Sequence, residues 1–275
     1  MKRYLLFLLF VLFFFSCNND KKAAQENLQR VQLLYENNQL EAAKQSLDSL
    51  KAGFPKEVEV LKEGLQIMRQ VEIKELERNI LYYDSMLIVR TSQADSLKKL
   101  FVYEKDPKYD ETGKYIDKQQ VLERNLGRSY IRSGVNEQGE MYIASVYHGK
   151  GRIRHNQLKV SAPDNSYTET AVIPEDGGVN FSFQDLGMTT EVVTYQNEKD
   201  NGVILFIYNN SKKRLKAELP GNKSYSFFIA EGDIKSLIKT HDFSVVLSDI
   251  QRLGKEKEKA NARIEYLSSK LKTEN

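Results

Sequence analysis

The sequence has 275 residues, with 41 Lys and Arg against 38 Asp and Glu, and a formal net charge of +3 at pH 7. So small a basic excess argues against a nucleic-acid-binding protein, for which a strong excess or a basic stripe is expected. The length is enough for one or two domains, and the single cysteine excludes an internal disulfide.

The N-terminus has the pattern of an export signal. Lys2 and Arg3 are followed by an apolar stretch of 12 residues, 4–15, and polar residues begin directly after Cys17. A retained membrane helix needs about 20 apolar residues to cross roughly 30 Å of hydrocarbon. We therefore expect residues 1–16 to be a signal peptide that is removed. Its loss brings the net charge of the chain closer to zero.

The only cysteine lies directly behind this apolar stretch, and Phe14-Phe15-Ser16-Cys17 resembles the lipobox of a bacterial lipoprotein. The resemblance implies cleavage before Cys17, diacylglycerol on its sulfur and a third acyl chain on its amine. Two acyl chains give stable anchoring where one is marginal. We therefore expect a lipid-anchored protein of the cell envelope, in the outer membrane of a Gram-negative bacterium, on its periplasmic or its outer face. The alternative is a signal peptide cut elsewhere, with Cys17 unmodified.

After a short tether, residues 17–23, apolar residues at helical spacing predict helices over residues 24–55. The part from 33 to 55 resembles one tetratricopeptide unit, with Ala43 as the small residue of the second helix and Pro55 closing the unit. A single unit cannot bury its own apolar face, because such repeats need about three neighbours. An ordinary helical hairpin with a Pro stop is the alternative, and in both cases we expect it to pack on the next helix.

Two long segments carry residues at alternating spacings of four and three, which is the a/d pattern of a coiled coil. In the segment 56–104 this seam consists of Leu76, Ile80, Tyr83, Leu87, Arg90, Ala94, Leu97 and Phe101. In the segment 231–275 it consists of Val246, Ile250, Leu253, Lys257, Ala260, Ile264, Leu267 and Leu271.

We expect the two seams to cover each other within one chain. The helix 56–101 leads into the middle region and the helix 243–272 leaves it, so pairing within the chain is antiparallel and forms a stalk. A short helix before Asp242, which would cap the long one, completes the C-terminal segment. The alternative is that the C-terminal seam pairs with a second copy, which gives a coiled-coil dimer in place of a monomer.

The middle region, residues 120–230, changes to a period of two. Short runs rich in Val, Ile, Tyr, Phe and Thr are separated by turn sequences such as Asn136-Glu137-Gln138-Gly139 and Asp200-Asn201-Gly202. Strands at this spacing predict an antiparallel β-sandwich, with the doubly apolar run Val203–Tyr208 as its central strand. The predicted fold class is therefore α+β with segregated helices and strands, the sandwich being inserted between the stalk helices.

No catalytic motif stands out in the sequence. Ser-x-x-Lys occurs three times within predicted helices, without the other motifs of penicillin-binding enzymes, so we interpret it as a chance polar pattern. His148 and His155 flank a Gly-bounded turn, but no third ligand is spaced to complete a zinc site; with His241 they are interpreted as surface histidines. We predict no enzyme activity, metal or cofactor. A hydrolase would need carboxylates that only the fold could bring together.

Two features of the middle region favour ligand binding. Arg152 and Arg154 alternate along a predicted strand and would share one face, with Lys150 and Tyr147 nearby. Such a strip suits the carboxylates of cell-wall polymer or acidic lipid, and tyrosine rings can stack on sugars, although the chain has no Trp. The alternative is a solvated strand edge that charge protects from unwanted pairing.

The leading functional hypothesis is a non-enzymatic scaffold or adaptor that presents the β-sandwich to another envelope protein. A polysaccharide- or peptidoglycan-binding lipoprotein that uses the Arg152 and Arg154 strip is the alternative. Both hypotheses place the chain on a membrane through Cys17, and neither involves nucleic acid.

Overall fold

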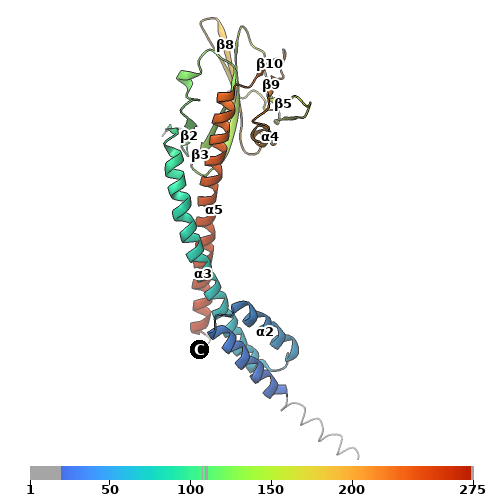
Figure 1. The fold of residues 1–275 in the computed structure, drawn as a ribbon, viewed down its shortest axis with the longest axis vertical. Helices are drawn as coiled ribbons and strands as arrows, with labels where there is room; N and C mark the ends of the chain where they lie inside the picture. Colours follow the sequence, from blue (N-terminus) through green and yellow to red (C-terminus); the bar gives the residue numbers. More distant parts are fainter. Residues whose placement is uncertain (1–19, 107, 109–110, 274–275) are drawn as a thin grey trace, which may run out of the picture. The chain divides into compact units, whose positions relative to one another are not determined.

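The computed structural model describes residues 20–106, 108 and 111–273, so the signal peptide and the lipidation site at Cys17 lie outside the described residues. Helices occur together with antiparallel sheets, and the C-terminal helix is long (Figure 1), which confirms the predicted mixture of the two classes. The chain divides into two compact units. Unit 1 comprises the described residues up to Met86 and those from Gly254 onward, and unit 2 comprises Leu87–Leu253.

The helices cover residues 20–36, α2 (Leu40–Gly53), α3 (Val58–Lys98), α4 (Val203–Asn209) and α5 (Glu231–Thr273), with a short 3₁₀ helix at Leu122–Arg124. The strands are β1 (Phe101–Glu104), β2 (Lys114–Asp117), β3 (Tyr130–Asn136), β4 (Met141–Gly149), β5 (Lys159–Ser161), β6 (Tyr167–Glu169), β7 (Asn180–Asp185), β8 (Met188–Tyr195), β9 (Lys216–Leu219) and β10 (Tyr225–Phe228). Unit 1 therefore contains helices and no strand in its described part, and all strands formed by the described residues belong to unit 2.

Unit 1 has a core made by the first helix, α2 and the beginning of α3. Its buried residues are Ala24, Leu28, Val31, Leu40, Ala43, Leu47, Leu50, Val60, Ile67 and Val71. Gly64 of α3 packs against α2, where a Cβ added to it would lie 3.3 Å from Leu47 and 3.4 Å from Leu50. The small residue therefore lets the two helices approach closely.

Helices α3 and α5 run antiparallel in each unit taken by itself. In unit 1, Arg263 Nε lies 2.7 Å from a carboxylate oxygen of Glu72, and Lys257 Nζ lies 2.5 Å from one of Asp84. In unit 2, Arg90 pairs with Asp249 at 2.9 Å. The predicted seam residues of both helices are buried or half-buried, and the polar seam residue Lys257 is matched by a carboxylate on the opposite helix.

Two predicted helix boundaries were wrong. The first long helix ends at Lys98, before both the predicted helix end at 101 and the end of the segment at 104. Phe101, the last seam residue, begins β1, from which it still packs on Phe243 of α5 at a ring distance of 4.9 Å. The sheet region therefore starts before residue 120. Asp242 is not a cap either, because α5 is one continuous helix of 43 residues. Buried Leu237 and Phe243 continue the same apolar face past Asp242.

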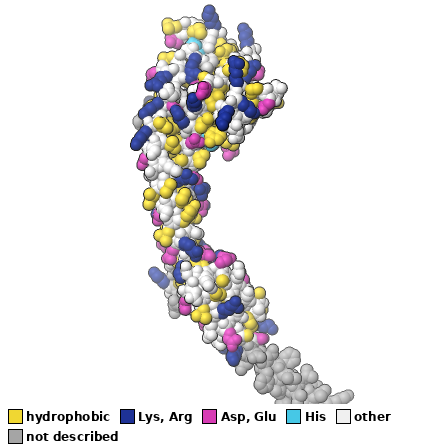
Figure 2. Space-filling view, viewed as in Figure 1, with side chains coloured by type: hydrophobic (Ala, Val, Ile, Leu, Met, Phe, Trp, Pro, Cys, Tyr) yellow, Lys and Arg dark blue, Asp and Glu magenta, His cyan; other side chains and the backbone are white. Residues whose placement is uncertain are grey.

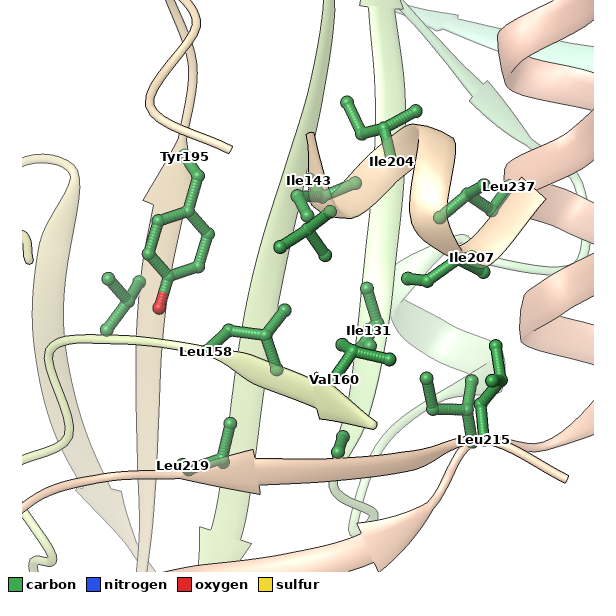
Figure 3. Packing of buried hydrophobic residues seen from close by; sticks show 14 of the residues in the cluster. Ile131, Ile143, Leu158, Val160, Tyr195, Ile204, Ile207, Leu215, Leu219 and Leu237 are labelled. Carbon is green, nitrogen blue, oxygen red and sulfur yellow. The ribbon is translucent and has the colours of Figure 1, made fainter. Parts of the chain in front are cut away.

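Unit 2 contains two antiparallel sheets. The first has six strands in the order β1-β2-β3-β4-β8-β7, and the second has four in the order β10-β9-β5-β6. The inward residues of both sheets, with α4 and the first turns of α5, contribute to a single core (Figure 3). Figure 3 labels Ile131, Ile143, Leu158, Val160, Tyr195, Ile204, Ile207, Leu215, Leu219 and Leu237.

The run Val203–Tyr208 is helix α4 and not the predicted central strand. A short run that is apolar on all sides has the same pattern in a buried strand and in a buried helix. The preceding turn decides between them. Gly202 has a φ of +83°, and a carboxylate oxygen of Asp200 accepts the backbone N–H of Gly202 at 3.1 Å and that of Ile204 at 3.4 Å, which begins the helix.

Candidate functional site

The outer face of the six-stranded sheet, which points away from the shared core, forms an open cleft with a volume of about 770 Å³. We call it the outer cleft. Its floor is made by outward-pointing residues of three neighbouring strands: Tyr130, Arg132, Tyr142, Ala144, Val146, His148, Thr190, Val192 and Thr194. The segment 122–128 and the β7–β8 hairpin line it as well. Ligand-binding clefts are commonly about 300–1,000 Å³ and mostly apolar, so the outer cleft has the size and lining of a binding site.

Large apolar side chains are exposed at the rim of the outer cleft. Leu126 is 71% exposed and Leu186 is 95% exposed, and Leu122 and Phe183 are also exposed. Leu186 and Gly187 form the two-residue turn between β7 and β8, with φ values of +47° and +76°. Such turns favour Asn or Gly at the first position. A leucine there serves neither the turn nor the core, which is typical of a contact residue.

The segment 122–128 is fixed to the first turn of α5 by Arg128. Its guanidinium donates to the two carboxylate oxygens of buried Asp233 at 2.8 and 2.6 Å and also to the side chain of Asn125. It lies 4.4 Å from the centre of the Tyr130 ring. The hydrogen bonds to Asp233 raise the pKa of Arg128 above its ordinary value. The rim of the cleft that carries Leu126 is therefore held by a charged pair that is desolvated on the Asp233 side.

One glycine shapes the floor. Gly134 of β3 lies directly opposite Tyr142 of β4. A Cβ added to Gly134 would lie 2.5 Å from the Tyr142 ring, so the ring covers the glycine and could not do so over any larger residue. The absence of a side chain at position 134 therefore sets where the aromatic ring lies in the outer cleft.

A second, smaller hollow of about 180 Å³ lies beside β7, and we call it the arginine pocket. It is lined by Arg152, Arg154, His155, Asn156, Glu175, Asn180, Phe181, Ser182 and Glu191. Arg152 forms an ion pair with Glu175. The guanidinium of Arg154 is exposed and has no ion pair or hydrogen bond to any described residue. Phe181 lines the outer cleft too, so the two sites meet at β7.

Arg152 and Arg154 were predicted to share one face of a strand. Residues 152–158 are not a strand, so the two arginines reach this pocket in another way. The carboxylate of Glu191 accepts the backbone N–H groups of Ile153, Arg154 and His155 at 2.8, 2.9 and 3.0 Å. Arg154 has a φ of +54°. The segment therefore curls around one carboxylate instead of joining a sheet, and this curl brings both guanidinium groups to the same hollow.

His155 is buried, and its prediction as a surface histidine was wrong. Its Nδ1 donates to the Glu191 carboxylate at 2.9 Å, and its Nε2 lies 3.0 Å from the hydroxyl of Ser145, which in turn lies 3.1 Å from the Tyr195 hydroxyl. Burial alone would raise the pKa of Glu191, but the hydrogen bonds from His155 and from the backbone of Arg154 and His155 outweigh it and lower that pKa to about 2. Glu191 is therefore ionised at neutral pH.

The Ser145, His155 and Glu191 side chains follow the order of a hydrolase triad. Ser145 is completely buried, however, and its hydroxyl already contacts His155 and Tyr195. A nucleophile must reach the substrate, and no substrate can approach an oxygen inside the core. The network consequently positions residues 152–158 rather than performing chemistry.

Of the remaining predicted residues, Tyr147 and Lys150 line neither hollow. Tyr147 is buried against Tyr225 with a ring distance of 5.1 Å, and Lys150 is exposed beyond the end of β4. His148 lies in the outer cleft, with Nδ1 3.1 Å from the Thr190 hydroxyl, while His155 points to the opposite face of the sheet. The two histidines do not converge. No three His, Cys, Asp or Glu side chains in the described ranges gather as a metal site requires.

Sequence reasoning missed the apolar rim of the outer cleft. The one available signal was the Leu186-Gly187 pair, where a leucine takes the place of the polar residue usual in a tight turn. On the face drawn in Figure 2, charged side chains of both signs are interspersed with apolar ones, without one continuous basic patch.

Among the described residues, no helix is both long and apolar enough to cross a bilayer. Comparisons with protein-family models, with curated proteins and with solved structures found no match for this chain. The outer cleft and the arginine pocket are therefore the features from which a function is inferred.

Proposed function

We propose that this chain is a lipid-anchored protein of the bacterial envelope that acts as a non-enzymatic adaptor and binds another envelope protein through the outer cleft. The observation that carries the proposal is the open apolar cleft of about 770 Å³ with Leu126 and Leu186 exposed at its rim. Exposed apolar side chains grouped around a concave surface are typical of a protein-binding site. The anchor rests on the lipobox resemblance at Cys17, and the membrane is the outer membrane of a Gram-negative bacterium.

The architecture that we propose for this role is a β-sandwich inserted between two helices that pair within one chain. Two antiparallel sheets with one common core support the sandwich. Ion pairs between α3 and α5 in each unit support pairing within a monomer. In this arrangement the inner sheet faces are used for folding, which leaves the outer face of the six-stranded sheet for binding.

The adaptor role can be tested by site-specific photocrosslinking in cells. A photoreactive amino acid replaces Leu126 or Leu186 in the full-length chain, and Leu205, an exposed apolar residue of α4 that does not line the outer cleft, serves as the matched control. We expect one envelope protein to be crosslinked from both cleft positions and not from Leu205. The same products from all three positions, or none from the cleft, would contradict the proposal.

The second candidate function is binding of cell-wall polysaccharide or peptidoglycan at the arginine pocket. The specific observation in its favour is the guanidinium of Arg154, which has no partner among the described residues and lines the pocket together with Arg152, because guanidinium groups bind carboxylates well. Sedimentation with purified peptidoglycan tests it. Binding that is lost in the double variant Arg152→Glu, Arg154→Glu would favour this function, and equal binding by the variant would remove it.

A further inference from the structure

We propose that the partner is bound as an extended peptide segment that adds a strand to the free edge of β7, with apolar residues on one face of that strand and acidic residues on the other. This inference rests on the proposed adaptor function and specifies its binding mode. It joins the outer cleft and the arginine pocket, which lie on the two faces of the same strand, into one site.

The edge of β7 that faces away from β8 is open. This strand ends the six-stranded sheet, so only its β8 side is paired. The carbonyl of Val179 accepts the N–H of Thr194, and backbone groups alternate in direction along an antiparallel strand. The backbone groups of Asn180, Ser182 and Gln184 therefore point away from β8. Those of Asn180 are used by the loop at residues 176–177, whereas those of Ser182 and Gln184 face the open edge.

This edge is long and carries neither Lys nor Pro. Native proteins keep edge strands short or place Lys or Pro on them, because an open edge pairs with other chains. Within the described residues, β7 is the longest of the four edge strands, with six residues against three or four for β1, β6 and β10. Its sequence, NFSFQD, contains neither Lys nor Pro, and its one charged residue, Asp185, is the last residue of the strand, next to the turn. An unprotected edge is the feature used by proteins that bind extended peptides as an added strand.

The two faces of β7 differ in their chemistry. Phe181 and Phe183 lie on the cleft face with their rings stacked at 6.5 Å. Ser182 lies on the other face, opposite Glu191 in the register, and lines the arginine pocket. A neighbouring strand runs about 4.8 Å away and its side chains alternate in the same way. One set of its side chains would therefore meet the phenylalanines and the other set the arginines.

The charge of the arginine pocket determines which side chains of the added strand can face it. Arg152 is already paired with Glu175, whereas Arg154 has no partner among the described residues. A carboxylate on the added strand would supply that partner, and a lysine there would be repelled. The pattern that suits both faces is thus an alternation of Val, Leu or a similar residue with Glu or Asp. An acyl chain, a glycan or the β7 edge of a second copy would not need this alternation.

The experiment measures binding of synthetic peptides to the purified full-length chain in detergent by fluorescence anisotropy. One labelled nine-residue peptide alternates Val with Glu, and a second alternates Val with Lys. Two further peptides repeat the acidic sequence with backbone N-methyl groups at alternate residues. One of them is methylated at the odd positions and the other at the even positions. We expect the acidic peptide to bind. The Lys peptide loses about one charge-assisted contact and should bind at least roughly tenfold more weakly. One of the two N-methyl peptides loses the backbone hydrogen bonds to the edge of β7 and should be weakened by at least roughly the same factor.

Variants of the chain complete the test. Pro at position 182 or 184 removes an edge N–H that β8 does not use, so Ser182→Pro and Gln184→Pro should abolish peptide binding, and Gln184→Ala should not. Arg154→Glu should remove the preference for the acidic peptide, whereas Lys212→Glu, at an exposed lysine outside the arginine pocket, should leave it unchanged. Circular dichroism verifies that the proline variants are folded, and the N-methyl peptides test the edge without any variant.

The possible results separate this inference from the adaptor function. Equal binding of acidic and basic peptides, equal binding of both N-methyl registers, or no peptide binding would overturn the added-strand mode. Crosslinks from Leu126 and Leu186 to one envelope protein would still support the adaptor if they persisted in Ser182→Pro. Concentration-dependent dimers that are lost in the same variant would instead show that the edge binds a second copy, and this too would refute the inference.

Discussion

Replacing Glu191 by Gln should unfold the segment that carries the arginine pocket. Glu191 is 2% exposed and accepts four hydrogen bonds, from the backbone N–H groups of Ile153, Arg154 and His155 and from Nδ1 of His155. A glutamine keeps one oxygen for the first two donors. Its NH₂ group, however, is itself a donor and would face the two donors of His155.

The loss of folding stability in Glu191→Gln follows both from the lost hydrogen bonds and from the lowered pKa of Glu191. Hydrogen bonds to a charged group each contribute about 1.5–3 kcal/mol, so the loss of the two His155 bonds should cost about 3–6 kcal/mol. Separately, the hydrogen bonds lower the pKa of Glu191 from the ordinary 4.5 to about 2, and at 1.36 kcal/mol per pKa unit this corresponds to about 3 kcal/mol. Both values are a large fraction of the roughly 5–15 kcal/mol that stabilises a typical domain.

The stability that Glu191 contributes depends on pH. Because the pKa of Glu191 is lower in the folded protein, its contribution to stability is complete above about pH 4.5 and is lost as the pH falls towards 2. The Glu191→Gln variant has no ionisable group at this position. It should therefore be less stable than the wild type at pH 7 and should lack this component of the acid-induced destabilisation.

Urea unfolding at pH 7 and at pH 3, followed by circular dichroism, measures both effects, and hydrogen exchange of residues 152–158 provides the local readout. Glu175→Gln is the matched control, since it removes a carboxylate whose partner, Arg152, lies on the surface, and exposed ion pairs contribute only about 0–1 kcal/mol. A loss below about 1 kcal/mol for Glu191→Gln, with unchanged exchange of residues 152–158, would refute this reasoning.

Three further predictions follow from other contacts. Gly139→Ala should lower the free energy of unfolding by about 2 kcal/mol or more, because Gly139 has a φ of +87° and an added Cβ would lie 2.4 Å from the backbone nitrogen of Ser248. Thermal unfolding measures this loss. The control variant Gly151→Ala, at a glycine with a similar φ but open space around it, should lose clearly less stability. Arg128→Ala leaves the buried Asp233 carboxylate without its ion pair, so we expect the free energy of unfolding to fall by about 3–5 kcal/mol. Proteolysis near residue 126 should become faster, and unchanged proteolysis would show that this ion pair does not hold the rim. Sedimentation equilibrium of the full-length chain in density-matched detergent should give a monomer, because α3 already covers the seam of α5 in each unit, and a stable dimer at micromolar concentration would contradict pairing within one chain.

Local patterns in the sequence were sufficient for the long helices and for many of the strands. A helix that is half covered must place apolar residues at spacings of three and four, so the predicted seam from Val246 to Leu271 coincides with the buried and half-buried face of α5. The turn at residues 136–139 was also predictable, because a sharp reversal between two alternating runs requires glycine or asparagine at defined positions. These features depend only on residues close together in the chain.

The candidate site depended on contacts between residues far apart in the sequence, and only the tertiary structure decided it. The acceptor for the backbone of residues 153–155 is the side chain of Glu191, so the period-two pattern of that segment could not reveal that it is no strand. Likewise, the six-residue run at α4 has the same hydrophobicity in either conformation, and the turn at Gly202, whose N–H and that of Ile204 donate to the Asp200 carboxylate, decided the outcome. The outer cleft arises because Leu126 and Phe183, 57 positions apart, lie along one sheet face, and periodicity carries no information about pairings of that range.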